Sequence, residues 1–122
     1  MTDLPERTKS FASRVIRLSL ALPKHDLTKV FGPRMPRSAT SVAAQTREGR
    51  RPKSAKDFVS KIEGAIQELE ETELWMEFIV DHKLMAASKL KALFQEAGEL
   101  NAIMTTMVRN TKRRSAEGVL QR

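Results

Sequence analysis

The feature that most constrains this chain is a regular run of apolar residues between positions 58 and 79. The run steps by alternating fours and threes through Phe58, Ile62, Ala65, Leu69, Thr72, Met76 and Ile79. This spacing puts all of them on one face of an α-helix, as in the seams of four-helix bundles. Ser54 and Asp57 supply a helix start signal. The spacing therefore predicts a helix over 54–82.

Two further segments show helical spacing. Phe11, Val15 and Leu18 predict a helix over 4–22, and a stripe from Leu90 to Val108 predicts another that begins at a Ser88 cap and fades near residue 112. No alternating strand pattern is present. The sequence predicts an all-α protein, an antiparallel up-down-up-down four-helix bundle over 1–112, with a basic flexible tail over 113–122.

The remaining segment contains two prolines. Asp26 could open a helix there, but Pro33 and Pro36 follow. An interior proline removes a backbone donor and costs about 3 kcal/mol in a regular helix. We therefore expect the second helix to be kinked or broken near Pro33 and Pro36 and to resume over about 37–48. Small residues in the resumed part favour close packing against its neighbours.

Composition narrows the class of protein. The 122 residues are enough for one domain with a single core. The absence of Cys excludes disulfides and thiolate metal sites. No apolar run approaches the roughly 20 residues of a membrane span, and the first residues do not resemble a secretory signal. A cytoplasmic location without membrane association is expected.

Catalytic and metal chemistry have little support in the sequence. There is no Cys or Tyr, and His25 and His82 lie in no recognisable catalytic motif. Bundle di-metal sites use Glu-x-x-His pairs, but Leu22 and Ile79 precede the two histidines by three residues. We predict no enzyme activity, no catalytic residues, no metal and no cofactor.

Glu68 and Glu71 have a structural interpretation instead. Both could face Arg37 on the second helix and form a charge-assisted polar core pair that fixes the register of the bundle. A catalytic or phosphate-binding role for Arg37 is the alternative.

Positive charge is concentrated at two places. Residues 1–56 hold 13 Lys and Arg against 4 Asp and Glu, whereas residues 57–101 hold 4 against 10. The candidate nucleic-acid-binding residues are Arg47, Arg50, Arg51, Lys53 and Lys56 in one cluster and Lys112, Arg113 and Arg114 in the other. No aromatic residues are interleaved with them, so phosphate contacts rather than base stacking are predicted. Alternatively, these cations form a solvated face or attract acidic helices.

The end of the helix predicted over 54–82 is apolar around more of its circumference than one stripe can hide. Leu74, Trp75 and Phe78 are the candidate residues for a contact between subunits, because exposed apolar patches usually mark association sites. A ligand pocket around Trp75 is the alternative.

Several motifs together resemble a known family. They are Thr8-Lys9-Ser10-Phe11, Arg37 to Ala44 followed by Arg47-Glu48-Gly49, Ser54 to Phe58, and Glu68, Glu71-Thr72 and Trp75. In this order and spacing they resemble the 23S rRNA-intervening-sequence proteins, bacterial four-helix proteins, although Gln45 stands where that family usually has Asn. The resemblance implies an antiparallel four-helix bundle that assembles into a ring-shaped homopentamer. Some relatives are encoded within large-subunit rRNA genes, many stand alone, and a distant branch serves retroelements as a basic accessory protein.

Taken together, the sequence predicts a non-enzymatic oligomeric bundle whose partners are further copies of itself and RNA or DNA, bound through the basic surface without strong sequence preference. The alternative is a protein-interaction or assembly scaffold with no nucleic-acid role.

Overall fold

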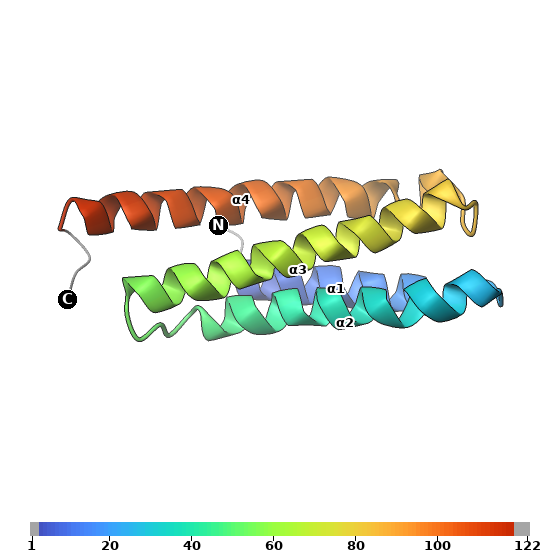
Figure 1. Cartoon of the computed structure of the whole chain (residues 1–122), viewed down its shortest axis with the longest axis horizontal. Helices are drawn as coiled ribbons and strands as arrows, with labels where there is room; N and C mark the ends of the chain where they lie inside the picture. The colour runs from blue at the N-terminus through green and yellow to red at the C-terminus, as the bar shows by residue number, and fades with distance from the viewer. Residues whose placement is uncertain (1–2, 119–122) are drawn as a thin grey trace.

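The computed structural model describes residues 3–118 of the chain. This part forms α1 (Leu4–Leu20), α2 (Asp26–Glu48), α3 (Ala55–Asp81) and α4 (Lys91–Ala116), with a short 3-10 helix, η1 (Ala87–Lys89), before α4. Successive helices run in opposite directions (Figure 1), which confirms the predicted antiparallel four-helix arrangement. No helix in the described part combines the length and the apolar character that crossing a membrane would need.

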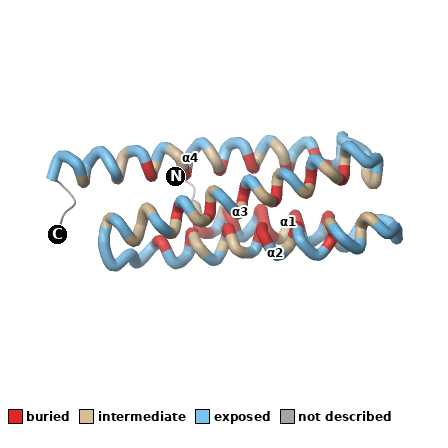
Figure 2. The backbone as a smooth tube through the Cα atoms, viewed as in Figure 1, coloured by how far each residue is buried: buried red, intermediate tan, exposed pale blue. Residues whose placement is uncertain are grey.

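The core lies along the faces that the helices turn toward one another (Figure 2). Contact is most extensive between α2 and α3, less extensive between α3 and α4, and small between α1 and α4. Six of the seven residues in the predicted α3 run are buried, and Phe58 is half-buried against the core. The helical spacing read from the sequence therefore identifies the packed face of the longest helix correctly.

Helix caps agree with the sequence at α3 but not at α2. At α3 the Ser54 side chain accepts the Asp57 N–H at 3.0 Å, as predicted. At α2 the cap is His25 rather than Asp26: its Nδ1 accepts the Leu27 N–H at 3.0 Å, while Thr28 Oγ1 accepts the His25 N–H at 3.1 Å. The reciprocal pair satisfies backbone donors that the first turn leaves open.

α2 passes through Pro33 and Pro36 without a break, so the predicted restart of the helix at residue 37 is wrong. Pro36 has no N–H to donate to the carbonyl of Gly32 four residues earlier. The Ser19 hydroxyl of α1 donates to that carbonyl oxygen instead, at 2.8 Å. A neighbouring helix thus supplies the hydrogen bond that the proline removes.

α4 differs from its predicted bounds at both ends. It begins at Lys91 without a side-chain cap, because η1 occupies the position of the predicted Ser88 cap. It ends at Ala116, so residues 113–116 are helical and the predicted boundary at residue 112 is wrong. Arg113 and Arg114 in the last turn favour this extension, since cations are stabilising at the negative end of a helix dipole. Residues 119–122 of the predicted tail lie outside the described residues.

Two buried hydroxyl pairs join the helices inside the core. Oγ1 of Thr8 lies 2.7 Å from Oγ1 of Thr46, and Oγ of Ser38 lies 2.7 Å from Oγ1 of Thr72. All four residues are buried, and each hydroxyl also lies within hydrogen-bond distance of a backbone carbonyl on its own helix. Because these polar groups are satisfied, they fix helix register without the cost of an unpaired buried group.

An arginine of α1 forms an ion pair with α4, although the two helices share little contact. Arg7 donates from Nε and Nη2 to the two carboxylate oxygens of Glu96 at 2.7 and 2.8 Å, and Nη2 also reaches Glu99 at 2.8 Å. The Arg7 and Glu96 side chains are only 22% and 17% exposed. The hydrogen bond from Arg7 lowers the pKa of Glu96 below its ordinary value, despite the opposing effect of burial.

Glu73 on α3 is shifted in the other direction. Partial burial raises the pKa of its carboxyl, and the nearby carboxylates Glu77 and Glu70 raise it further. Ionised Glu73 therefore disfavours the folded state, and this loss of stability develops as the pH rises above the ordinary glutamate pKa. The stability that Glu96 contributes is instead lost as the pH falls below that value.

We expect the stability contributed by Glu96 to be complete above the ordinary glutamate pKa of about 4.3, and to be lost as the pH falls through the lower pKa of the folded state. Glu96→Gln should therefore lower the free energy of unfolding at neutral pH and should lose less stability than the unmodified protein between about pH 4 and pH 2. Urea denaturation at several pH values measures both effects. Glu99→Gln, at the more exposed partner, is the control and should cost less at neutral pH. An unchanged acid dependence in Glu96→Gln would contradict this assignment.

Candidate nucleic-acid interface

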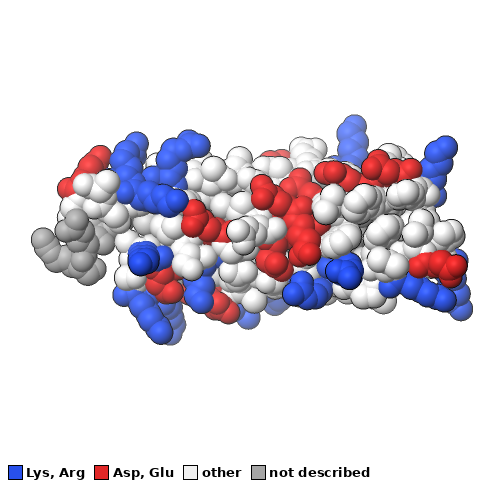
Figure 3. Space-filling view, in the orientation of Figure 1, with Lys and Arg blue, Asp and Glu red and all other residues white. Residues whose placement is uncertain are grey.

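The antiparallel topology brings the two basic clusters to one end of the bundle. α2 ends there, α3 begins there and α4 ends there (Figure 1). Lys112 Nζ on α4 lies 3.0 Å from Glu63 Oε2 on α3 in an exposed ion pair between the two helices at this end. We call the following residues the basic end: Arg47, Arg50, Arg51, Lys53, Lys56, Lys112, Arg113 and Arg114. In Figure 3, Lys and Arg gather on both edges of this end, whereas Asp and Glu gather near the middle of the molecule.

Local hydrogen bonds shape the connection between α2 and α3. Gly49 continues the α2 hydrogen bonding by donating to the Gln45 carbonyl at 2.9 Å. Its own position is buried, and a Cβ there would meet Ile62 Cδ1 at 3.2 Å, so a small residue suits this site. Asp57 Oδ2 accepts the Lys53 N–H at 3.0 Å. The backbone of the connection is therefore anchored at both ends, while the side chains of Arg51 and Lys53 remain exposed.

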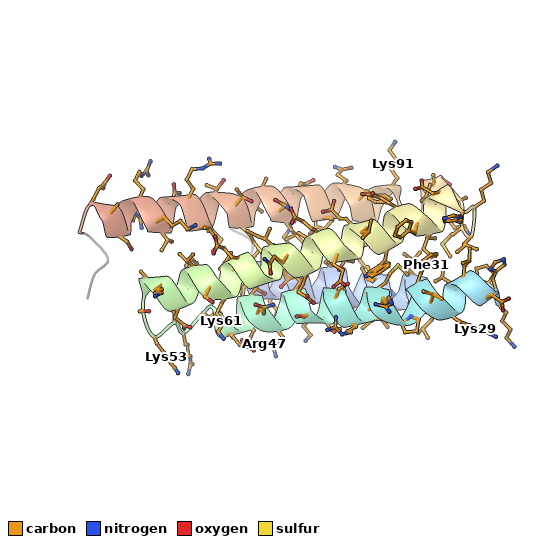
Figure 4. The ribbon with its side chains drawn as sticks, viewed as in Figure 1. Lys29, Phe31, Arg47, Lys53, Lys61 and Lys91 are labelled. Carbon is orange, nitrogen blue, oxygen red and sulfur yellow. The ribbon has the colours of Figure 1, made fainter. Side chains whose placement is uncertain are left out.

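Most cations of the basic end have no carboxylate partner. Arg50 lies 3.8 Å from Asp3, and Lys112 pairs with Glu63. Within residues 3–118 the others form no ion pair, and all are exposed. Figure 4 shows Arg47 and Lys53 pointing away from the bundle on the same edge, with Lys61 near them where α3 and α2 meet. Lys61 extends this surface although it was not among the predicted residues, and it lies 3.3 Å from Glu48.

The predicted polar core around Arg37 is corrected by the structure. Arg37 Nη1 does approach Glu68 and Glu71, at 4.0 and 3.9 Å, the outer limit of an ion pair. Its side chain, however, is 74% exposed, so the group is a solvated surface cluster and not a core pair. The partly buried ion pair that fixes helix positions is Arg7 with Glu96, which the sequence spacing did not indicate because the two residues are 89 positions apart.

The rings predicted to contact another subunit pack partly within the chain. Phe31 of α2 stacks on Trp75 and Phe78 of α3, with ring centroids 6.1 and 5.4 Å apart. His82 lies 6.4 Å from the Phe31 ring, and the Arg34 guanidinium lies 5.3 Å from the Trp75 centroid. We call these five residues the aromatic cluster. Leu74, by contrast, is 42% exposed. The sequence analysis did not predict the ring contacts of Phe31, because this residue precedes the two prolines where a helix break was expected.

Within residues 3–118, no three His, Asp or Glu side chains lie close enough together to hold a metal ion. The surface does carry shallow hollows, and one of about 420 Å³ lies beside the basic end between α1 and α2, lined by Lys9, Thr40, Ala43, Ala44, Arg47 and Glu48. Lys9 and Arg47 both line this hollow, so Lys9 is a further cation near the basic end.

Comparison with known proteins identifies the family. The family model described as 23S rRNA-intervening sequence protein matches residues 3–106. The chain belongs to this family. A solved structure from Bacteroides thetaiotaomicron, described as a protein with unknown function from the S23 ribosomal protein family, is 24% identical. The match covers 87% of this chain and 98% of that one, with a TM-score of 0.80, and shows a shared fold. No curated protein matches the chain in sequence.

Several motif residues of this 23S rRNA-intervening sequence protein lie along the outer seam between α2 and α3. Starting at the basic end, Glu48 forms an ion pair with Lys61. The Gln45 side chain then packs over Gly64. Further along, Arg37 forms a long ion pair with Glu71. A Cβ on Gly64 would overlap the Gln45 side-chain oxygen, so the glycine makes room for the amide that replaces the usual Asn. The seam ends at the aromatic cluster, which includes Trp75.

We expect Arg7→Met to lower the free energy of unfolding by about 2 kcal/mol, because it leaves the Glu96 carboxylate partly buried without its charged donors. Arg37→Met should cost less than about 1 kcal/mol, since its ion pairs are long and solvated. Urea denaturation of the two variants checks this order. Equal losses would show that Arg37 contributes more than its exposure indicates.

Proposed function

We propose that this protein is a non-enzymatic, cytoplasmic bundle that binds RNA or DNA through the phosphates at its basic end. The observation that carries the proposal is the meeting of two basic clusters, far apart in sequence, at one end of the bundle. Cations without carboxylate partners are available for phosphate oxygens, which accept their hydrogen bonds. The solved relative is described as a member of the S23 ribosomal protein family, which is consistent with an RNA partner.

The expected binding is electrostatic and only weakly dependent on sequence. Each phosphate contact releases condensed counterions, so the logarithm of the affinity should fall with the logarithm of salt by about 0.9 per contact on duplex DNA and by about 0.7 on single strands. Phosphates carry no base identity, so exchanging the sequence at fixed length should change the affinity little.

The test replaces cations that have no ion-pair partner. Arg51→Glu combined with Lys53→Glu should weaken binding to every nucleic acid alike and reduce the salt slope, as measured by fluorescence anisotropy with labelled RNA and DNA. Arg50 is left intact because its reversal would also disturb Asp3. Circular dichroism should show unchanged helix content in the variant.

The matched control reverses two exposed cations at the opposite end, Lys89→Glu with Lys91→Glu, and leaves the same net charge as the test variant. Equal losses in the two variants would assign the binding to overall charge and not to the basic end. If the unmodified protein binds no nucleic acid at low salt, the assembly-scaffold function takes the place of this proposal.

We also propose self-association, with the ring-shaped homopentamer that the family resemblance implies as the expected form. It is supported by large apolar side chains that the single chain leaves exposed, among them Leu74 and, at 81% exposure, Leu20. Of the candidate contact residues Leu74, Trp75 and Phe78, we place the contact on Leu74, because Phe31 already covers part of the other two.

Light scattering at micromolar concentration should therefore give a mass near five times the 13.8 kDa of one chain. Leu74→Lys should lower that mass, whereas Leu74→Met, which keeps the apolar contact, should not. A monomeric mass for the unmodified protein would refute the assembly.

A further inference from the structure

The rings of the aromatic cluster pack around Phe31 where α2 and α3 meet. The Phe31 ring is tilted by only 15° from Phe78, 27° from Trp75 and 28° from His82. Phe31 lies between the two helices in Figure 4. Phe31, Trp75 and Phe78 are half-buried and His82 is exposed, so the cluster reaches the surface.

Core packing alone does not account for all of these residues. Phe31 and Trp75 pack against the buried core, but Phe78 is not among the half-buried side chains that do so. The ring contacts of Phe78 are with Phe31, Trp75 and His82. In addition, the Trp75 Nε1 donor is buried without a hydrogen-bond acceptor in the described part of the chain. That donor is shielded from the surface, whereas the partly exposed Phe78 ring suits stacking against a planar ligand.

Positive charge adjoins the rings. Arg34 covers part of Trp75 and offers a flat guanidinium on which a base can stack. Arg37 follows one turn later on α2, and Arg47 lies about 20 Å beyond Arg34 at 1.5 Å per residue. Figure 3 shows Lys and Arg side chains at intervals along the α2 edge, with Asp and Glu among them. A flexible polyanion held at the basic end can therefore follow α2 to the rings.

We propose that the aromatic cluster stacks unpaired bases of a single-stranded nucleic acid whose phosphates follow α2 from the basic end. This inference rests on the proposed function and adds the form of the ligand. A duplex keeps its bases paired and cannot offer their faces to the rings, whereas a single strand can splay them out. The site thus favours single-stranded segments while remaining tolerant of sequence, because every base has a stacking face.

Trp75 is the only tryptophan, and the chain has no tyrosine, so intrinsic fluorescence reports directly on this cluster. The probes are a single-stranded RNA of mixed sequence, an abasic oligomer with the same number of phosphates, and a duplex of the same length. The single strand should quench Trp75 and bind roughly ten-fold or more tighter than the abasic oligomer, a difference typical of one stacked base. The abasic oligomer and the duplex should bind without quenching.

Variants then separate the rings from the charge. Phe78→Leu, which keeps apolar bulk without the ring, and His82→Ala should each lower single-strand affinity several-fold and leave abasic and duplex affinities unchanged. Val30→Ala, which shortens an exposed apolar side chain next to Phe31 on α2, is the matched control and should change none of them. Melting curves confirm that the variants remain folded.

The outcomes distinguish the two proposals. If no probe binds, the proposed function fails and this inference fails with it. If all three probes bind equally and Trp75 is not quenched, the basic end still binds phosphates but the stacking site is overturned. If Phe78→Leu instead lowers the mass of an oligomer without changing single-strand affinity, the cluster is a contact between subunits and the inference is likewise overturned.

Discussion

The burial of one face of α3 is the interaction on which the rest of this structure depends. Ala65, Leu69 and Met76 on that face are completely buried, with α2 packed along one flank of the helix and α4 along the other. Short connections make both neighbours antiparallel to α3. As a result, the connection that carries Arg47 to Lys56 and the last turns of α4 come to the same end. The location of the positive charge is therefore a consequence of core packing.

Polar groups between the packed helices fix their register, because apolar contact alone would let the helices slide along one another. The hydroxyl pairs Thr8 with Thr46 and Ser38 with Thr72 join α1 to α2 and α2 to α3. Arg7 performs the corresponding role between α1 and α4. The Ser19 hydroxyl compensates the carbonyl that Pro36 leaves without a donor, which lets α2 stay helical along its whole length. Each of these groups is satisfied by a partner on another helix, so its burial is compensated.

The continuity of α2 also matters for the surface. A break at the prolines would have turned Phe31 and Arg34 away from α3, whereas the intact helix places them against Trp75 and Phe78. The outer seam between α2 and α3 then runs from the basic end, past Gln45 lying over Gly64, to these rings. The cations proposed to bind phosphates and the rings proposed to stack bases are thus carried largely by the same pair of helices.

The sequence by itself determined the helical class, the packed face of α3, the family and the identity of the basic clusters. Each of these depends on residues close together in the chain, where a period of 3.6 or a run of charge is visible directly. Only the tertiary structure decided that Arg7 and not Arg37 is the partly buried cation, and that Phe31 covers Trp75 and Phe78. These choices depend on which residues of different helices face each other, and helix periodicity does not specify that register. The break expected in α2 was misjudged because local propensity is overridden when a neighbouring helix supplies the missing hydrogen bond. The end of α4 was misjudged because cations in its last turn stabilise the helix there.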